Sequence, residues 1–164
     1  MARPYQPILG TLIYLVDTRT DCVLMMHRDT RTDDEHYGKY NGLGGKVESN
    51  EDITSSAIRE VKEESGLTCE ALDLRGTISW PGFGAKGEDW FGFIFLCKKF
   101  SGTVIPACPE GHLHWIPMSK LMTLNMWEGD RHFLPLVFDR NPEAFHGVMP
   151  YEHGRPTDWR FSRQ

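Results

Sequence analysis

The chain has 164 residues, of which 40% are hydrophobic and 25% are charged, and this ordinary globular mixture excludes a disordered protein. Its net charge of −5 argues against binding to a nucleic-acid polymer, which normally requires a basic surface. No apolar run approaches the roughly 20 residues of a transmembrane helix, and no signal-peptide core follows the N-terminus. The four cysteines include no C-x-x-C pair, so we expect four reduced thiols in a cytoplasmic protein.

The first predicted elements form a hairpin. Residues 8–16 and 22–27 are apolar and rich in strand-favouring residues, and the polar segment 17–21 between them is typical of a turn. A polar loop is expected over residues 29–39. Three glycines then predict a tight bend with exposed backbone: Gly42, Gly44 and Gly45.

The clearest predicted helix runs from Asp52 to Ser65. Asp52 is of a type that caps helix N-termini, and Gly66 lies where a left-handed residue ends a helix. The helix has an apolar stripe made of Ile53, Ala57, Ile58 and Val61. This helix therefore has a beginning, an end and a face that can be buried.

The rest of the chain alternates between strand and helix signals. Three further strands are expected over residues 77–80, 90–98 and 112–116, and two short helices over residues 118–121 and 132–138. Together with the early helix, this order predicts an α+β sandwich with a mixed sheet, in one domain over residues 1–164. The basic tail, residues 155–164, can add an edge strand or a dimer contact, and the sequence does not choose between them.

Three glutamates on the predicted helix lie where charges are costly. At about 100° per residue, Glu60, Glu63 and Glu64 share an arc of about 100° beside the apolar stripe, while Lys62 points away. Acidic residues that served solubility alone would lie opposite the stripe, and these repel one another unless a cation neutralises them. Their spacing suits Mg²⁺ or Mn²⁺. The alternative interpretation is a solvated acidic helix face.

The residues around these glutamates favour the metal interpretation. The segment 45–67 has the spacing G-x5-E-x7-R-E-V-x-E-E-x-G-L, which is made by Gly45, Glu51, Arg59, Glu60, Val61, Glu63, Glu64, Gly66 and Leu67. This spacing matches every fixed position of the Nudix box, and the chain resembles a Nudix hydrolase. The resemblance implies the Nudix fold, an α/β/α sandwich with a central mixed β-sheet, and metal-dependent hydrolysis of a diphosphate linkage.

The resemblance also implies a metal site that binds Mg²⁺ or Mn²⁺. The expected ligands are the carboxylates of Glu60, Glu63 and Glu64, together with the backbone carbonyl of Gly44. Arg59 joins the catalytic group by holding a neighbouring carboxylate, for which Glu51 is the candidate. Relatives use a further acid outside the box as a metal ligand or general base, and Glu110, which precedes a predicted strand, is the candidate. The alternative for Glu110 is a loop-capping role.

Beyond the box, the similarity narrows to one group of Nudix hydrolases. Residues 40–47, 126–135 and 145–147 are similar to segments of the MutT- and MutX-type 8-oxo-dGTP diphosphatases, the oxidised purine nucleoside triphosphatases. This resemblance implies that the substrate is a nucleoside triphosphate, with 8-oxo-dGTP cleaved to 8-oxo-dGMP and pyrophosphate. The expected partner is thus a small nucleotide, with no nucleic-acid polymer and no membrane, and the chain is expected to be a monomer or homodimer.

Five residues can supply the substrate pocket. The Asn41 amide can pair with a purine edge, and Asp130 can accept from the N1–H and 2-amino groups of guanine or share a proton with the base. Trp127 can stack on the base. Arg28 lies at a strand end from which it can reach the phosphates, and Lys46 is also assigned to substrate binding.

Each of these assignments has an alternative. Asn41 can simply stabilise its turn, Trp127 can be core, and Arg28 can be a surface residue. Gly129 stands where the related pocket carries the first of two adjacent aspartates, so one base-reading acid is missing and the breadth of recognition is in doubt. The loop at 81–84 resembles those of Nudix hydrolases of ADP-ribose or nucleoside-diphosphate sugars. A non-catalytic nucleotide-sensing module is the remaining alternative.

Overall fold

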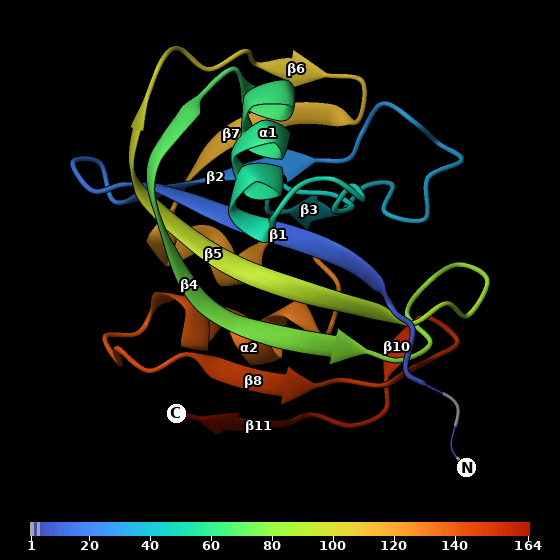
Figure 1. Cartoon of the computed structure of the whole chain (residues 1–164). Coiled ribbons are helices and arrows are strands. Elements are labelled where there is room, and N and C mark those ends of the chain that lie inside the picture. Colours follow the sequence, from blue (N-terminus) through green and yellow to red (C-terminus); the bar gives the residue numbers. More distant parts are fainter. Residues whose placement is uncertain (1, 3) are drawn as a thin grey trace.

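A mixed β-sheet forms the centre of the molecule (Figure 1). In the computed structural model, which describes residue 2 and residues 4–164, this sheet has nine strands in the order β11-β8-β4-β5-β1-β2-β7-β6, with β3 paired to β2. The strands are β1 (Ile8–Asp17), β2 (Cys22–His27), β3 (Tyr40–Asn41), β4 (Thr68–Trp80), β5 (Trp90–Ser101), β6 (Ala107–Cys108), β7 (Gly111–Pro117), β8 (Phe145–Val148) and β11 (Arg160–Arg163). The β1–β5 and β4–β8 pairs are parallel and the other pairs are antiparallel.

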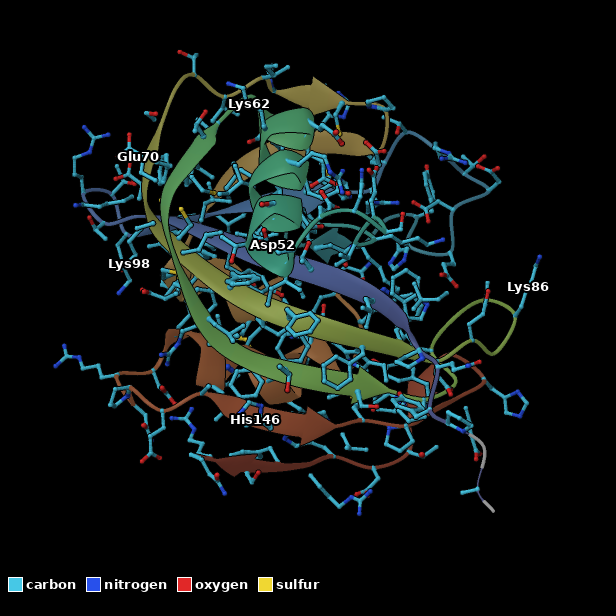
Figure 2. The ribbon with its side chains drawn as sticks, viewed as in Figure 1. Asp52, Lys62, Glu70, Lys86, Lys98 and His146 are labelled. Carbon is cyan, nitrogen blue, oxygen red and sulfur yellow. The ribbon has the colours of Figure 1, made fainter. Side chains whose placement is uncertain are left out.

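The principal helix, α1 (Ile53–Ser65), begins and ends as its sequence predicts. The Asp52 carboxylate accepts hydrogen bonds from the backbone N–H groups of Thr54 and Ser55, both at 2.9 Å. Gly66 has a left-handed φ of 77°, and its N–H donates to the Lys62 carbonyl. Figure 2 labels Asp52 and Lys62 near opposite ends of this helix. Local capping signals were therefore sufficient to place both ends of α1.

The helices lie on opposite faces of the sheet. In Figure 1, α1 lies in front of the sheet, while α2 (Asp130–Phe138) lies behind it. The alternation of β1 separates the two hydrophobic cores: Ile13 packs on the face of Val61, and Tyr14 packs on the face of Phe133. A short 3-10 helix, η1 (Met118–Thr123), contributes Leu121 to the α2 face. This arrangement confirms the predicted α/β/α sandwich.

Strand β4 is longer than the prediction of 77–80. Its register with β5 shifts at three places: between Cys69 and Ala71, between Ala71 and Asp73, and between Leu74 and Gly76. Each irregularity interrupts the alternation of apolar and polar residues on which strand prediction depends. The polar first part of β4 was therefore missed because its pattern is broken, although it is paired along most of its length with β5.

The C-terminal segment forms an edge strand, one of the two roles left open for the tail. Strand β11 pairs antiparallel with β8, and β9 (Tyr151–Glu152) and β10 (Arg155–Pro156) form a small separate ribbon. In β11, Arg163 donates to Asp139, just after α2, at 2.6 Å. Among the described residues, no helix is both long and apolar enough to cross a membrane. All four cysteines are free.

Arg75 fixes α2 against the sheet. The residue is only 9% exposed, although arginine is rarely buried. It donates hydrogen bonds to the carbonyl of Val137 at 2.9 Å, to the Asp139 carboxylate at 3.0 Å and to the carbonyl of Asn141 at 2.9 Å. A buried guanidinium is stable there because it satisfies carbonyls that a helix C-terminus leaves without partners. These hydrogen bonds fix the C-terminal end of α2, the helix whose first residue is Asp130.

Candidate active site

The glycine bend predicted from the sequence packs against both β1 and α1. Gly44 has a φ of 147°, and its backbone N–H donates to the Glu64 carboxylate at 3.0 Å. The N–H of Thr11 in β1 donates to the carbonyl of Gly45 at 2.9 Å. A Cβ at Gly44 would overlap the backbone carbonyl of Thr11, so the bend needs glycine for both its torsion and its close approach.

We expect Gly44→Ala to lower the free energy of unfolding by about 3 kcal/mol, since it combines a disfavoured φ with a backbone overlap. The matched control is Gly154→Ala, where φ is 76° but nothing lies within 4 Å of the added Cβ. The control should cost only about 1 kcal/mol. Urea denaturation measures both values, and equal losses would contradict the close-packing argument.

The carboxylates of Glu60 and Glu64 lie in unfavourable surroundings for negative charge. Glu64 is 9% exposed, and burial, opposed in part by the Gly44 hydrogen bond, raises its pKa to about 8. Burial also raises the pKa of Glu60, and the charges of Glu63 and Glu110 raise it further. A Cβ at Gly45 would lie 2.5 Å from Glu60 Oε1, so the bend and the carboxylate touch. The site therefore concentrates negative charge beside the half-buried backbone of Gly44 and Gly45.

Arg59 organises the outer side of this acidic cluster. Its Nε and Nη2 donate to Glu51 at 2.9 and 2.6 Å, and these bonds lower the pKa of Glu51 to about 2. Its Nη1 donates to Glu60 at 3.0 Å and to Glu63 at 3.3 Å. The Glu63 side chain is otherwise mostly exposed. One guanidinium thus contacts three carboxylates, and the predicted partnership of Arg59 with Glu51 is present as two hydrogen bonds.

The oxygen atoms gathered at this site are suitable ligands for a hard divalent cation. Glu110 lies in the turn between β6 and β7, close enough for its charge to raise the pKa of both Glu60 and Glu64. Carboxylate and backbone oxygens are the ligands preferred by Mg²⁺ and Mn²⁺. Within the described residues, no three His, Cys, Asp or Glu side chains form a ready-made metal cage. Glu60 and Glu63 contact one positive charge, the Arg59 guanidinium, which donates a hydrogen bond to each of them.

A cavity of about 350 Å³ opens beside the glycine bend. All five residues assigned to substrate binding line it: Arg28, Asn41, Lys46, Trp127 and Asp130. Its remaining lining includes five glycines and four large aromatic residues, which are Trp80, Phe83, Trp90 and Tyr151. Because Gly44 and Gly45 also line the cavity, its floor adjoins the carboxylates of α1. A volume of this size suits a small ligand with a planar aromatic part.

Trp127 and Asp130 form one wall of the cavity. The Trp127 ring packs edge-on against Phe83, with centroids 5.3 Å apart, and Lys39 Nζ lies 4.8 Å from its centroid. Trp127 is therefore both a cavity wall and a residue packed against the core. Burial raises the pKa of Asp130 to about 7, opposed by the charges of Arg131 and Lys39. The Asp130 carboxyl group therefore changes between its protonated and ionised forms near neutral pH.

The other three assigned residues are held in different ways. Arg28 donates through Nε and Nη2 to Asp34, at 2.8 and 2.6 Å, so its charge is paired within the loop that follows β2. Lys46 Nζ lies 5.6 Å from the Trp90 ring centroid at the cavity edge. Asn41 lies in β3 opposite Met26 of β2. The structure brings all three to the cavity, and it pairs Arg28 with a carboxylate.

Sequence reasoning missed several lining residues. His36 and Glu35 belong to the loop expected over residues 29–39, and Tyr151 belongs to β9. Nothing in a polar loop indicates which side chains turn inward. Trp80 and Trp90 had a usable signal, since they flank one loop and face each other as paired residues of β4 and β5. Two aromatic residues at the mouth of a hairpin lie close together in space.

Comparison with known proteins agrees with this geometry. Residues 6–137 match the family model of the NUDIX domain. An uncharacterised Nudix hydrolase of Bacillus subtilis is 30% identical over 136 residues, covering 80% of each chain. An oxidised purine nucleoside triphosphate hydrolase of Danio rerio is 34% identical over 115 residues, covering 70% of this chain and 71% of that one.

Among solved structures, a MutT protein of Bacillus halodurans superposes with a TM-score of 0.80. It is 26% identical, and the match covers 94% of this chain and 97% of that chain. The fold, the arrangement of α1 beside a glycine bend, and the matched domain all lead to one conclusion. The chain belongs to the Nudix family of hydrolases.

Proposed function

We propose that this Nudix hydrolase is a pyrophosphohydrolase of oxidised purine nucleoside triphosphates, which cleaves 8-oxo-dGTP to 8-oxo-dGMP and pyrophosphate. In this role it would remove damaged nucleotides from the cytoplasmic pool before they enter DNA. One observation carries the proposal: an aromatic cavity that contains Asn41, Trp127 and Asp130 adjoins the acidic cluster of α1 through the glycine bend. A base in the cavity would place its phosphates toward that cluster.

The cavity supplies complementary groups for a purine. Asn41 offers both a donor and an acceptor, and Asp130, when ionised, accepts from two N–H groups on one base edge. Trp127 offers a ring face of the kind on which bases stack. Neighbouring aromatic side chains exclude water, so each polar contact with the base gains in strength. Discrimination among purines then depends on pairing these few polar groups.

The acidic cluster is assigned to the phosphates. Nudix hydrolases generally use divalent cations such as Mg²⁺, and the residues that would hold one are Glu60, Glu63, Glu64, Glu110 and the Gly44 carbonyl. When bound, the cation neutralises the diphosphate and lowers the pKa of the attacking water. The role of Arg59 is to fix the directions of Glu60 and Glu63 through its hydrogen bonds. The Gly44 N–H holds Oε2 of Glu64, which leaves Oε1 free to contact ligand.

A panel of substrates tests this proposal. Purified protein with Mg²⁺ is given dGTP, 8-oxo-dGTP, ATP, ADP-ribose and a nucleoside-diphosphate sugar, and the products are separated by ion-exchange chromatography. We expect the highest kcat/KM for 8-oxo-dGTP, with pyrophosphate as product. A preference for ADP-ribose or the sugar nucleotide would refute the assigned base pocket while leaving the acidic cluster intact. Tight binding of a nucleotide without turnover would instead indicate a sensing module.

A further inference from the structure

His36 is held in one orientation by contacts on two sides. Its Nδ1 accepts a hydrogen bond of 2.7 Å from the indole N–H of Trp127. Its backbone N–H donates to Asp34 at 3.0 Å, and Asp34 is fixed in turn by the two hydrogen bonds from Arg28. A chain of contacts from Arg28 to Trp127 therefore positions the imidazole in the loop that follows β2.

These contacts determine which ring nitrogen carries the proton. An indole N–H can only donate, so His36 Nδ1 must be unprotonated and the proton lies on Nε2. Burial lowers the pKa of His36 to about 4, and the charge of Arg28 adds to this effect, so the ring is neutral at physiological pH. His36 thus carries a single N–H donor whose ring position is fixed.

The Nε2–H group has no hydrogen-bond acceptor within the described part of the chain. The nearby Glu35 Oε1 lies 3.6 Å from it, beyond hydrogen-bond distance. Both residues line the cavity, and the His36 ring lies 6.2 Å from Phe83 and 5.4 Å from Trp127 between centroids. The donor is therefore in the aromatic part of the cavity, beside the Trp127 ring that is assigned to the base.

We propose that His36 is a specificity-determining residue, which donates its Nε2–H to a carbonyl oxygen of the bound purine. This inference rests on the proposed function, because it assumes a purine in the cavity. Guanine has such an oxygen at position 6 and 8-oxoguanine has a second at position 8, and either could be the acceptor. A base with a hydrogen or an amino group at that position leaves the donor unpaired, which costs binding energy.

The test compares substrates that differ by one carbonyl and by the hydrogen on the ring nitrogen beside it, and the His36 variants isolate the contribution of the carbonyl. The triphosphates of guanine and 2-aminopurine differ at position 6, and those of 8-oxoguanine and guanine differ at position 8. Each is assayed with the parent protein, His36→Phe and His36→Gln. We expect the His36 hydrogen bond to contribute roughly 3- to 10-fold to the parent's preference, in kcat/KM, for the substrate that has the contacted carbonyl. His36→Phe should lose that contribution, and His36→Gln should keep part of it because its amide can donate.

The matched control is His132→Phe, which changes an exposed histidine outside the cavity and should leave every ratio unchanged. If His36 only supports Trp127, His36→Phe will lower kcat/KM for all substrates by the same factor, and the proposal is wrong. An unchanged preference at both positions in His36→Phe would also overturn it. If the parent protein hydrolyses no purine triphosphate, the proposed function fails first and the His36 inference fails with it.

Discussion

Glu64→Gln should lower the rate of hydrolysis by about 10²- to 10⁴-fold and leave the fold intact. Glutamine has the same shape as the protonated glutamate and can still accept from the Gly44 N–H, but it cannot carry a negative charge toward a cation or take a proton. In metal-free buffer at neutral pH the same variant should be more stable than the parent protein, because folding no longer requires the Glu64 carboxylate to take up a proton. Activity and stability are therefore expected to change in opposite directions.

The pH dependence of the stability difference follows from the pKa of Glu64. In the folded protein this pKa is raised from 4.5 to about 8, so between these values the folded state binds more protons than the unfolded state. Stability then falls as the pH rises through this window, by up to about 1.4 kcal/mol per pH unit from this group. Glu64→Gln removes this dependence.

Urea denaturation in EDTA at pH 5 and pH 8, together with steady-state kinetics in Mg²⁺, measures both effects. The matched control is Glu70→Gln, which changes an exposed glutamate of β4 and should alter neither activity nor the pH dependence of stability. Turnover of Glu64→Gln within a few-fold of the parent value would exclude Glu64 from the metal and catalytic group.

Asp130→Asn should lower kcat/KM for guanine triphosphates by about 10- to 100-fold, the usual loss for a hydrogen bond to a charged group. The substitution keeps the volume and polarity of the side chain, but its NH₂ group faces a base edge that also donates. Substrates without N1–H and 2-amino donors, such as dATP, should lose much less. An equal loss for all bases would indicate a packing role for Asp130.

The same residue should make base preference depend on pH. Because the pKa of Asp130 is about 7, its carboxylate ionises as the pH rises through neutrality and becomes a double acceptor. The ratio of kcat/KM for dGTP to that for dATP should therefore rise between pH 6 and pH 8, while steps common to both substrates cancel. In Asp130→Asn the ratio should be flat, and in Asp73→Asn, an exposed aspartate of β4, it should match the parent protein.

Features that are determined by residues close together in the sequence were predictable. Helix α1 follows from Asp52, Gly66 and its apolar stripe, and the acidic cluster follows from the helical spacing of its glutamates. Asn41, Trp127 and Asp130 were chosen from segments that carry the resemblance, and Arg28 from its position at a strand end. The structure gathers them around one cavity.

Features that depend on distant contacts were not predictable. The orientation of His36 is set by Trp127, which is 91 residues away along the chain, and by the Arg28–Asp34 pair. The tail becomes a strand only because β8, itself too short to give a clear pattern, offers it an edge. Such pairings are stabilised by tertiary contacts, and no local pattern indicates them.

The cavity draws its lining from Gly10 near one end of the chain to Tyr151 near the other. No shorter segment contains all of the lining residues, so the cavity forms only after β1, α2 and β9 have come together. A ligand held there stabilises the folded state as a whole, because its binding energy is lost when any one of these elements detaches. Nucleotide supply and resistance to proteolysis would then be coupled: a cell rich in substrate would also preserve more of the enzyme.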